Sequence, residues 1–218
     1  MNKEWSELNK TMQAQIKKKD TYKRGIDTLL TLRSQLIQTL VSFKEELCRE
    51  DFNSIPFINA DGYHSKTIAY SIWHIFRIED IVAHTVITED EQVFFTGNYQ
   101  VRINSPIITT GNELVKQQIA DFSKQLNLEE LYSYIFEVRE STEKILERFS
   151  YDELKWKIPD ERKGYLKSLN VVNCDEKAIW LIDYWCSKDI RGLIQMPFSR
   201  HWIMHTEACL RIKNKMHS

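Results

Sequence analysis

Apolar side chains recur at spacings of three and four residues through most of the chain. The first such stretch, from Ile26 to Leu47, predicts a helix over about 24–50. The second predicts a helix over about 66–88, and its apolar arc is so wide that little polar face remains. We therefore expect this helix to lie deep in a bundle. Residues 1–22 are polar and predict a helical tail or N-terminal arm.

Helical spacing returns four times in the second half, over about residues 114–122, 128–149, 175–195 and 199–214. The third of these helices begins after Asn173-Cys-Asp-Glu176, which has the form of a capping box, and Pro197 ends it. Tyr99–Ile103 is predicted as a short extended piece, and residues 151–172 are predicted to be irregular.

The composition agrees with a helical fold. Only 6 Gly and 4 Pro occur in 218 residues, and a fold of many short strands needs turns that depend on these residue types. Hydrophobic residues make up 42% of the chain, which is enough for a core and argues against disorder. The sequence predicts one all-α domain over 1–218: a four-helix bundle with extra short helices and an elaborated connection before the last helix.

Charge and cysteine content exclude several classes of protein. The net charge of −1 provides no basic field for nucleic acid. No stretch approaches the roughly 18 apolar residues that span a bilayer, and the charged N-terminal residues do not resemble a signal peptide. The 4 Cys form no CxxC pair and are expected to be reduced thiols. We therefore expect a cytoplasmic protein that binds neither nucleic acid nor membrane.

The candidate chemistry lies in the histidines. His201 and His205 are one turn apart at the centre of the apolar face of the last helix. Either each is a core histidine bonded to a carbonyl or carboxylate, or both share a metal ion, and the spacing leaves both interpretations open. A metal would need a third ligand from elsewhere, and His74 in the most apolar helix is the best candidate. Cys209 is expected to be a buried core thiol, and His84 a surface or boundary residue.

Two short motifs carry a family resemblance. The segments Ser71-Ile-Trp-His74-Ile-Phe-Arg-Ile-Glu79 and Arg200-His201-Trp-Ile-Met-His205 resemble the DinB/YfiT-like superfamily. That resemblance implies a four-helix bundle with a three-histidine site for a divalent metal, usually zinc or nickel. Carried over to this chain, the ligands are His74, His201 and His205. The resemblance covers about 24–214 in helix order, but the second motif comes later than in compact members, so 151–195 is expected to be an elaboration.

The resemblance also suggests an activity. Several members are thiol-dependent transferases or isomerases that use a low-molecular-weight thiol such as bacillithiol or mycothiol, and others have no known activity. We expect a metal-dependent thiol S-transferase that acts on an electrophilic small molecule, with no catalytic residue assigned beyond the metal ligands. The alternative is a non-catalytic, metal-stabilised bundle that serves as a stress-response or interaction module. A homodimer is a family-level expectation.

Two carboxylates are candidates for supporting such a site. Glu79 lies about 140° from His74 around the same helix, at roughly 100° per residue, so direct ligation of the same ion is not expected. A hydrogen bond to a ligand, or an interhelical ion pair with an Arg, is expected instead. Asp183 on the 175–195 helix is a similar candidate. No HExxH, GxSxG, GxGxxG or P-loop motif occurs.

Overall fold

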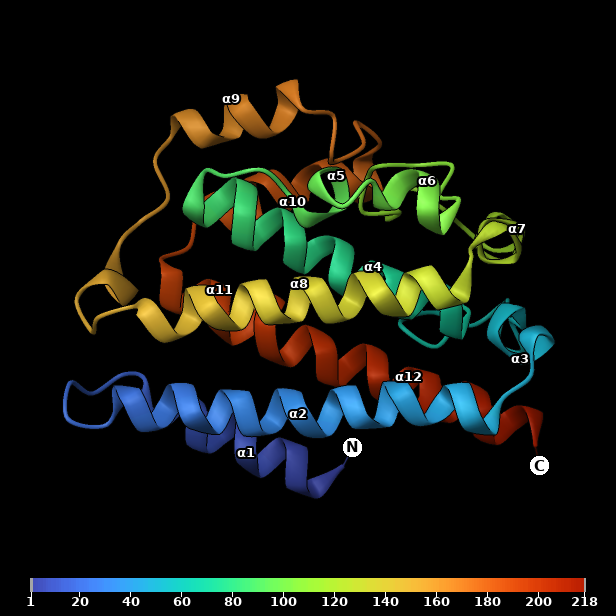
Figure 1. The fold of residues 1–218 in the computed structure, drawn as a ribbon, viewed down its shortest axis with the longest axis horizontal. Coiled ribbons are helices and arrows are strands. Elements are labelled where there is room, and N and C mark those ends of the chain that lie inside the picture. Colours follow the sequence, from blue (N-terminus) through green and yellow to red (C-terminus); the bar gives the residue numbers. More distant parts are fainter. Residues whose placement is uncertain (1, 218) are drawn as a thin grey trace.

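The computed structural model describes residues 2–217, which are about 70% helical and contain no strand (Figure 1). The α-helices are α1 Lys3–Gln15, α2 Tyr22–Glu46, α3 Arg49–Asn53, α4 Ile68–Asp80, α5 Val93–Thr96, α6 Tyr99–Ile103, α7 Gln117–Gln125, α8 Leu128–Arg148, α9 Glu161–Ser168, α10 Glu176–Cys186, α11 Ile190–Gln195 and α12 His201–Met216. Two π-helical segments, η1 Ile81–Thr88 and η3 Met196–Arg200, continue α4 and lead into α12, and η2 Glu153–Lys155 is a 3₁₀ turn.

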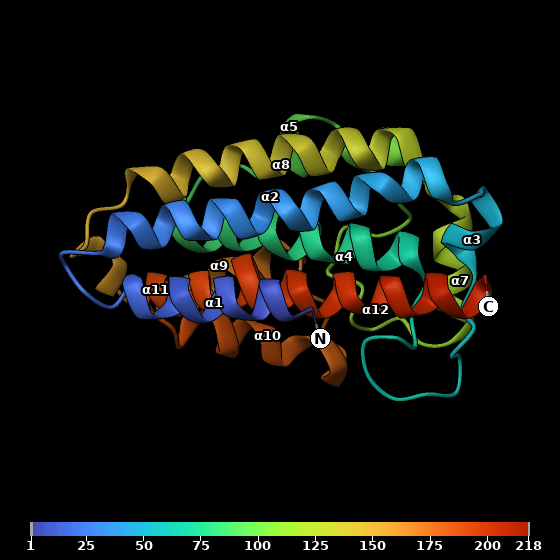
Figure 2. The same ribbon diagram turned by 90° about the horizontal axis from the view of Figure 1, so that it is seen from below.

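Four long helical segments lie side by side and form the centre of the molecule. Helix α4 contacts α8 and α12, and α2 also contacts α8 and α12, so the four close into a ring (Figures 1 and 2). All 13 residues of α4 are buried, which confirms the expectation that this helix lies deep in the structure. Helix α10 lies on the side away from α8 (Figure 2). None of the helices within 2–217 is long and apolar enough to cross a bilayer.

The N-terminal segment is a packed helix. Helix α1 lies along α2, with Trp5 and Met12 buried against the rest of the chain. The chain just after α1 passes close to Gly25 of α2, where an added Cβ atom would lie only 2.9 Å from the backbone nitrogen of Ile16. Buried apolar side chains and one glycine thus let this otherwise polar segment pack against α2.

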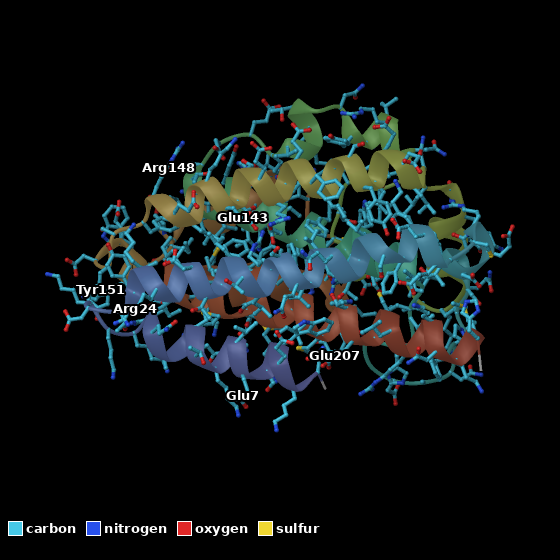
Figure 3. All side chains as sticks on the ribbon, turned by 60° about the horizontal axis from the view of Figure 1, so that its bottom comes forward. Glu7, Arg24, Glu143, Arg148, Tyr151 and Glu207 are labelled. Atoms are coloured by element: carbon cyan, nitrogen blue, oxygen red, sulfur yellow. The ribbon has the colours of Figure 1, made fainter. Side chains whose placement is uncertain are left out.

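Apolar side chains form two clusters, one toward each end of the long helices. One cluster includes Leu36, Ile72, Ile135 and Trp202, and the other includes Leu29, Val82, Leu146 and Phe198. Fully buried polar side chains lie at the boundary between them, and we call this set the buried polar layer: Arg33, Arg77, Glu79, Asp80, Thr142 and Ser199. Glu143 of α8, labelled in Figure 3, borders this layer and pairs with Arg33 of α2.

The structure corrects two of the predicted non-helical segments. Tyr99–Ile103 is not extended but forms helix α6, because Tyr99 and Ile103 are both buried and their spacing of four residues suits one face of a helix. Within 151–172, helix α9 presents only Arg162 and Leu166 to the interior. Two inward positions are too few to stand out as a helical pattern in a polar sequence.

The predicted 175–195 helix also differs from the structure in two respects. Its N-cap is Asp175 and not Asn173. The Asp175 side chain accepts a hydrogen bond from the Lys177 amide, while the Asn173 side chain accepts one from the Asp175 amide before the helix begins. The helix is also interrupted after Cys186, because Asp189 caps a new helix by accepting a hydrogen bond from the Gly192 amide. The segment before the last helix is therefore three short pieces, α10, α11 and η3.

Candidate metal centre

Three buried imidazoles meet between α4 and α12. His74 comes from the middle of α4, and His201 and His205 lie one turn apart on α12, with 4%, 7% and 3% of their surfaces exposed. Each residue offers one nitrogen to a common centre, and these nitrogens lie within 4.8 Å of one another. The structure thus brings together the three histidines that the sequence motifs selected.

One of the nitrogen separations matches that expected for a shared ion. The Nε2 atoms of His74 and His201 are 3.3 Å apart. Two imidazole nitrogens at zinc-binding distance from one ion, at a tetrahedral angle, lie about 3.4 Å apart. The rings are mutually tilted, with centroids 4.5–5.1 Å apart, so they surround a point and do not stack on one another.

The orientation of His74 is fixed from outside the cluster. Its Nδ1 donates a hydrogen bond to the carbonyl of Thr110 at 2.6 Å, because a carbonyl can only accept. Its Nε2 therefore carries a lone pair and faces the other two rings. The Thr110 carbonyl is presented by the turn at Gly111, whose φ of +75° belongs to the left-handed region. Tyr70 stacks on His74 and donates a hydrogen bond to the carbonyl of Gly111.

The surroundings favour the neutral form of all three imidazoles. Burial lowers the pKa of His74 to about 4, although its hydrogen bond to Thr110 opposes the change. Burial also lowers the pKa values of His201 and His205 well below the ordinary histidine value, and the neighbouring histidines lower them further. Neutral imidazole is the form that binds metal.

The hydrogen bonding within the cluster is incomplete without a further group. The Nδ1 atoms of His201 and His205 are buried and have no hydrogen-bond partner among residues 2–217. A hydrogen bond between His201 and His74 would satisfy one pair of nitrogens and leave His205 without a partner. Three neutral imidazoles that converge on one point are a donor set that fits a divalent cation, which would bind one nitrogen of every ring.

A cavity of about 190 Å³ opens beside the three histidines. Its wall is mostly apolar and aromatic: Ile78, Trp180, Leu181, Tyr184, Trp185, Met196 and Pro197. Trp180, Leu181, Tyr184 and Trp185 come from α10, which lies within the segment 151–195 predicted as an elaboration, and Met196 and Pro197 come from η3. A second hollow of about 160 Å³ also borders His74 and His205 and is lined by Gly62, Lys66 and Tyr70. Tyr63 and Asn112 border both hollows.

Tyr63 forms the outer edge of the site. Its ring packs edge-on against His205 with the centroids 4.8 Å apart, while 38% of its surface is exposed. Burial raises the pKa of Tyr63, and the charge of Arg200 opposes that change. Asn112 contributes a buried Oδ1 atom that has no partner within the described chain. These two residues give the site an aromatic edge and a free hydrogen-bond acceptor.

The two carboxylate candidates have different positions. Glu79 is buried and forms an ion pair with Arg33, and it also accepts a hydrogen bond from the indole of Trp202, which follows His201. It therefore contacts the neighbour of a proposed ligand and not the ligand itself. Asp183 is not at the site: its carboxylate is 77% exposed and pairs with Lys163, because α10 turns Leu181 and Trp185 inward instead.

The remaining sequence candidates lie outside the cluster. His84 is not a surface residue but is buried, and its two ring nitrogens bond to Asp90 and Ser141. Cys209 is fully buried, in agreement with its expected role as a core thiol. The sequence reasoning missed Tyr63, Lys66 and Asn112. These residues lie in or beside loops, and loop residues follow no periodic pattern that would indicate which way their side chains face.

The fold and the site together define an all-helical protein with a buried three-histidine cluster that has the geometry to hold a metal ion. No protein-family model matches the chain. No curated protein is significantly similar to it. The function is therefore argued from the site itself.

Proposed function

We propose that this protein is a divalent-metal-binding protein of the DinB/YfiT-like kind, and that it acts as a metal-dependent thiol S-transferase. The observation that carries the proposal is the convergence of His74, His201 and His205 beside an apolar cavity. The ring of four long helices is the arrangement that a DinB-like bundle requires. Zinc and nickel are the ions we expect, because three imidazole ligands suit either.

Three protein ligands leave coordination positions open to a small molecule. A divalent ion held this way lowers the pKa of a bound thiol, so that a thiolate is available at neutral pH. In the transfer, the thiol proton passes to solvent, the sulfur forms a bond to an electrophilic carbon, and the leaving group departs with its electron pair. The aromatic cavity would hold the electrophile and exclude water from it.

The first test measures metal in the protein purified at neutral pH without chelators. We expect about one divalent ion per chain, and we expect His74→Ala to lose most of it. His84→Gln is the matched control, because His84 lies on the continuation of the same helix and is equally buried but already has partners on both ring nitrogens. Absence of stoichiometric metal in the unmodified protein would overturn the proposal. Equal loss in both variants would assign the loss to destabilisation.

The second test separates an enzyme from a metal-stabilised scaffold. The metal-loaded protein is incubated with an aryl or alkyl halide and a low-molecular-weight thiol, and thioether formation is followed by mass spectrometry. We expect the unmodified protein to form thioether faster than the uncatalysed reaction. His74→Ala should form it only at the uncatalysed rate, and His84→Gln should form it as fast as the unmodified protein. Bound metal without turnover, together with a fourth protein ligand in the coordination sphere, would favour the non-catalytic bundle.

A further inference from the structure

Two hollows of different chemistry meet at the histidine cluster. The larger has walls of aromatic and aliphatic side chains, as described above. The smaller contains the ammonium-bearing side chain of Lys66 beside the ring of Tyr70. The two hollows share His74 and His205, so a molecule bound at the proposed metal would have both an apolar space and a cation beside it.

Lys66 differs from the other cations in the interior. Arg33 pairs with Glu79, Arg77 with Asp80, and Arg162 with Glu89. Lys66 is partly buried, and no carboxylate of residues 2–217 lies within ion-pair distance of it. Its ammonium group lies 5.5 Å from the centroid of the Tyr70 ring, its one contact with an aromatic face. A partly desolvated cation without an anionic partner is costly.

The electrostatics of the smaller hollow point to an anion. Burial lowers the pKa of Lys66, and no neighbouring acid opposes this. The residues that line the two hollows include no Asp or Glu within the described chain. A bound anion would offset the cost of the partly desolvated ammonium and would lie next to the proposed metal.

We infer that Lys66 recognises the carboxylate of a small-molecule thiol whose sulfur binds at the three-histidine centre. This inference rests on the proposed function and adds a substrate class to it: the thiol is an anionic mercapto acid and not a neutral mercaptan. Lys66 is a specificity residue in this arrangement, because it contacts the carboxylate and takes no part in bond making. The larger cavity remains free for the apolar electrophile.

The test uses the full-length protein loaded with Co²⁺, whose visible spectrum changes when a thiolate binds. Mercaptoacetate and 3-mercaptopropionate are titrated against neutral 2-mercaptoethanol, and two acid lengths are used so that the result does not depend on one spacing. We expect Lys66→Gln to weaken binding of at least one mercapto acid about tenfold, the size of one charge-assisted hydrogen bond. The affinity for 2-mercaptoethanol should change less than about twofold, and Lys66→Arg should retain the preference for the acid.

Lys10→Gln is the matched control for the loss of one positive charge, because Lys10 lies on α1 and is largely exposed. It should bind both kinds of thiol as the unmodified protein does. Equal weakening of acid and neutral thiols by Lys66→Gln, or no weakening of either, would overturn the inference and leave the metal centre intact. A failure of the unmodified protein to bind Co²⁺ would instead overturn the proposed function, and the assignment of Lys66 with it.

Discussion

Arg33 shows how much a single buried charge depends on its surroundings. Its guanidinium contacts both carboxylate oxygens of Glu79 at 2.7 and 2.9 Å, and it also donates to Glu143 and to the Phe198 carbonyl. Burial alone would lower the pKa of Arg33, but the two carboxylates outweigh this effect and raise it. Glu79 in turn holds the indole of Trp202. The group is fully satisfied only while every member is present.

The pair can be tested by removing its members in turn. Arg33→Met should lower the free energy of unfolding by about 3–5 kcal/mol, because Glu79 is left charged and buried. Adding Glu79→Gln should recover more than half of this loss, since an amide removes the orphaned charge and still accepts from Trp202. Urea unfolding of both variants measures the change. A double variant as unstable as the sum of the two single variants would show that the residues do not act as a pair.

At the scale of elements, the sequence predicted the long helices but not the connections. The positions of α2, α4 with η1, α8 and α12 followed from apolar periodicity, because each presents a continuous inward face. The π-helical form of η1 and η3 was not predictable, since a wider turn leaves the same apolar spacing nearly unchanged. The contact between the Thr110 carbonyl and His74 was also not predicted, because it depends on a backbone carbonyl and not on a side chain.

The turn at Gly111 that presents this carbonyl gives a prediction at the same scale. Gly111→Ala should lower the free energy of unfolding by at least about 2 kcal/mol, because its φ is +75° and an added Cβ would lie 2.8 Å from the Trp73 ring. Metal affinity should fall as well, since the Thr110 carbonyl would move away from His74. Urea unfolding and metal titration measure the two effects. Gly164→Ala is the control, because no atom lies within 4 Å of its added Cβ, and it should unfold at the same urea concentration or higher.

At the scale of the whole molecule, the candidate site depends on distant parts of the chain. The sequence selected His74, His201 and His205 through helix faces and a family resemblance, and the fold brings them together. The sequence did not reveal which residues line the cavity beside the histidines. Trp180 and Met196 lie on separate short elements, and no local pattern determines the direction in which these elements pack. The donors of such a site are thus easier to predict than the molecule they act on.

Burying three neutral imidazoles should also make the metal-free protein sensitive to acid. The pKa of His74 is about 4 in the folded chain against 6.5 for an ordinary histidine, so between these values the unfolded chain binds the proton more readily. Its stabilising contribution is therefore present above about pH 6.5 and is lost as the pH falls. For His74 the loss between about pH 7.5 and about pH 5 is on the order of 2 kcal/mol.

Urea unfolding in the presence of a chelator measures this dependence. His74→Gln should make the fall in stability with pH shallower, because one of the three groups no longer takes up a proton on unfolding. An unfolding free energy that does not change between about pH 7.5 and about pH 5 would mean that the three rings are accessible to protons in the folded state.

The buried polar layer restricts how the long helices can be aligned along their axes. If α2 were shifted along its axis by one turn, about 5.4 Å, the ion pair between Arg33 and Glu79 would be broken. Both charged groups would then lie against the apolar side chains of the two clusters. An apolar interface alone would tolerate such a slip far better, because one methyl group can replace another. The layer therefore selects one register among packings of similar hydrophobic energy. Because Glu79 of α4 also accepts a hydrogen bond from Trp202 of α12, the same carboxylate links the position of His201 and His205 along α12 to that of His74 along α4.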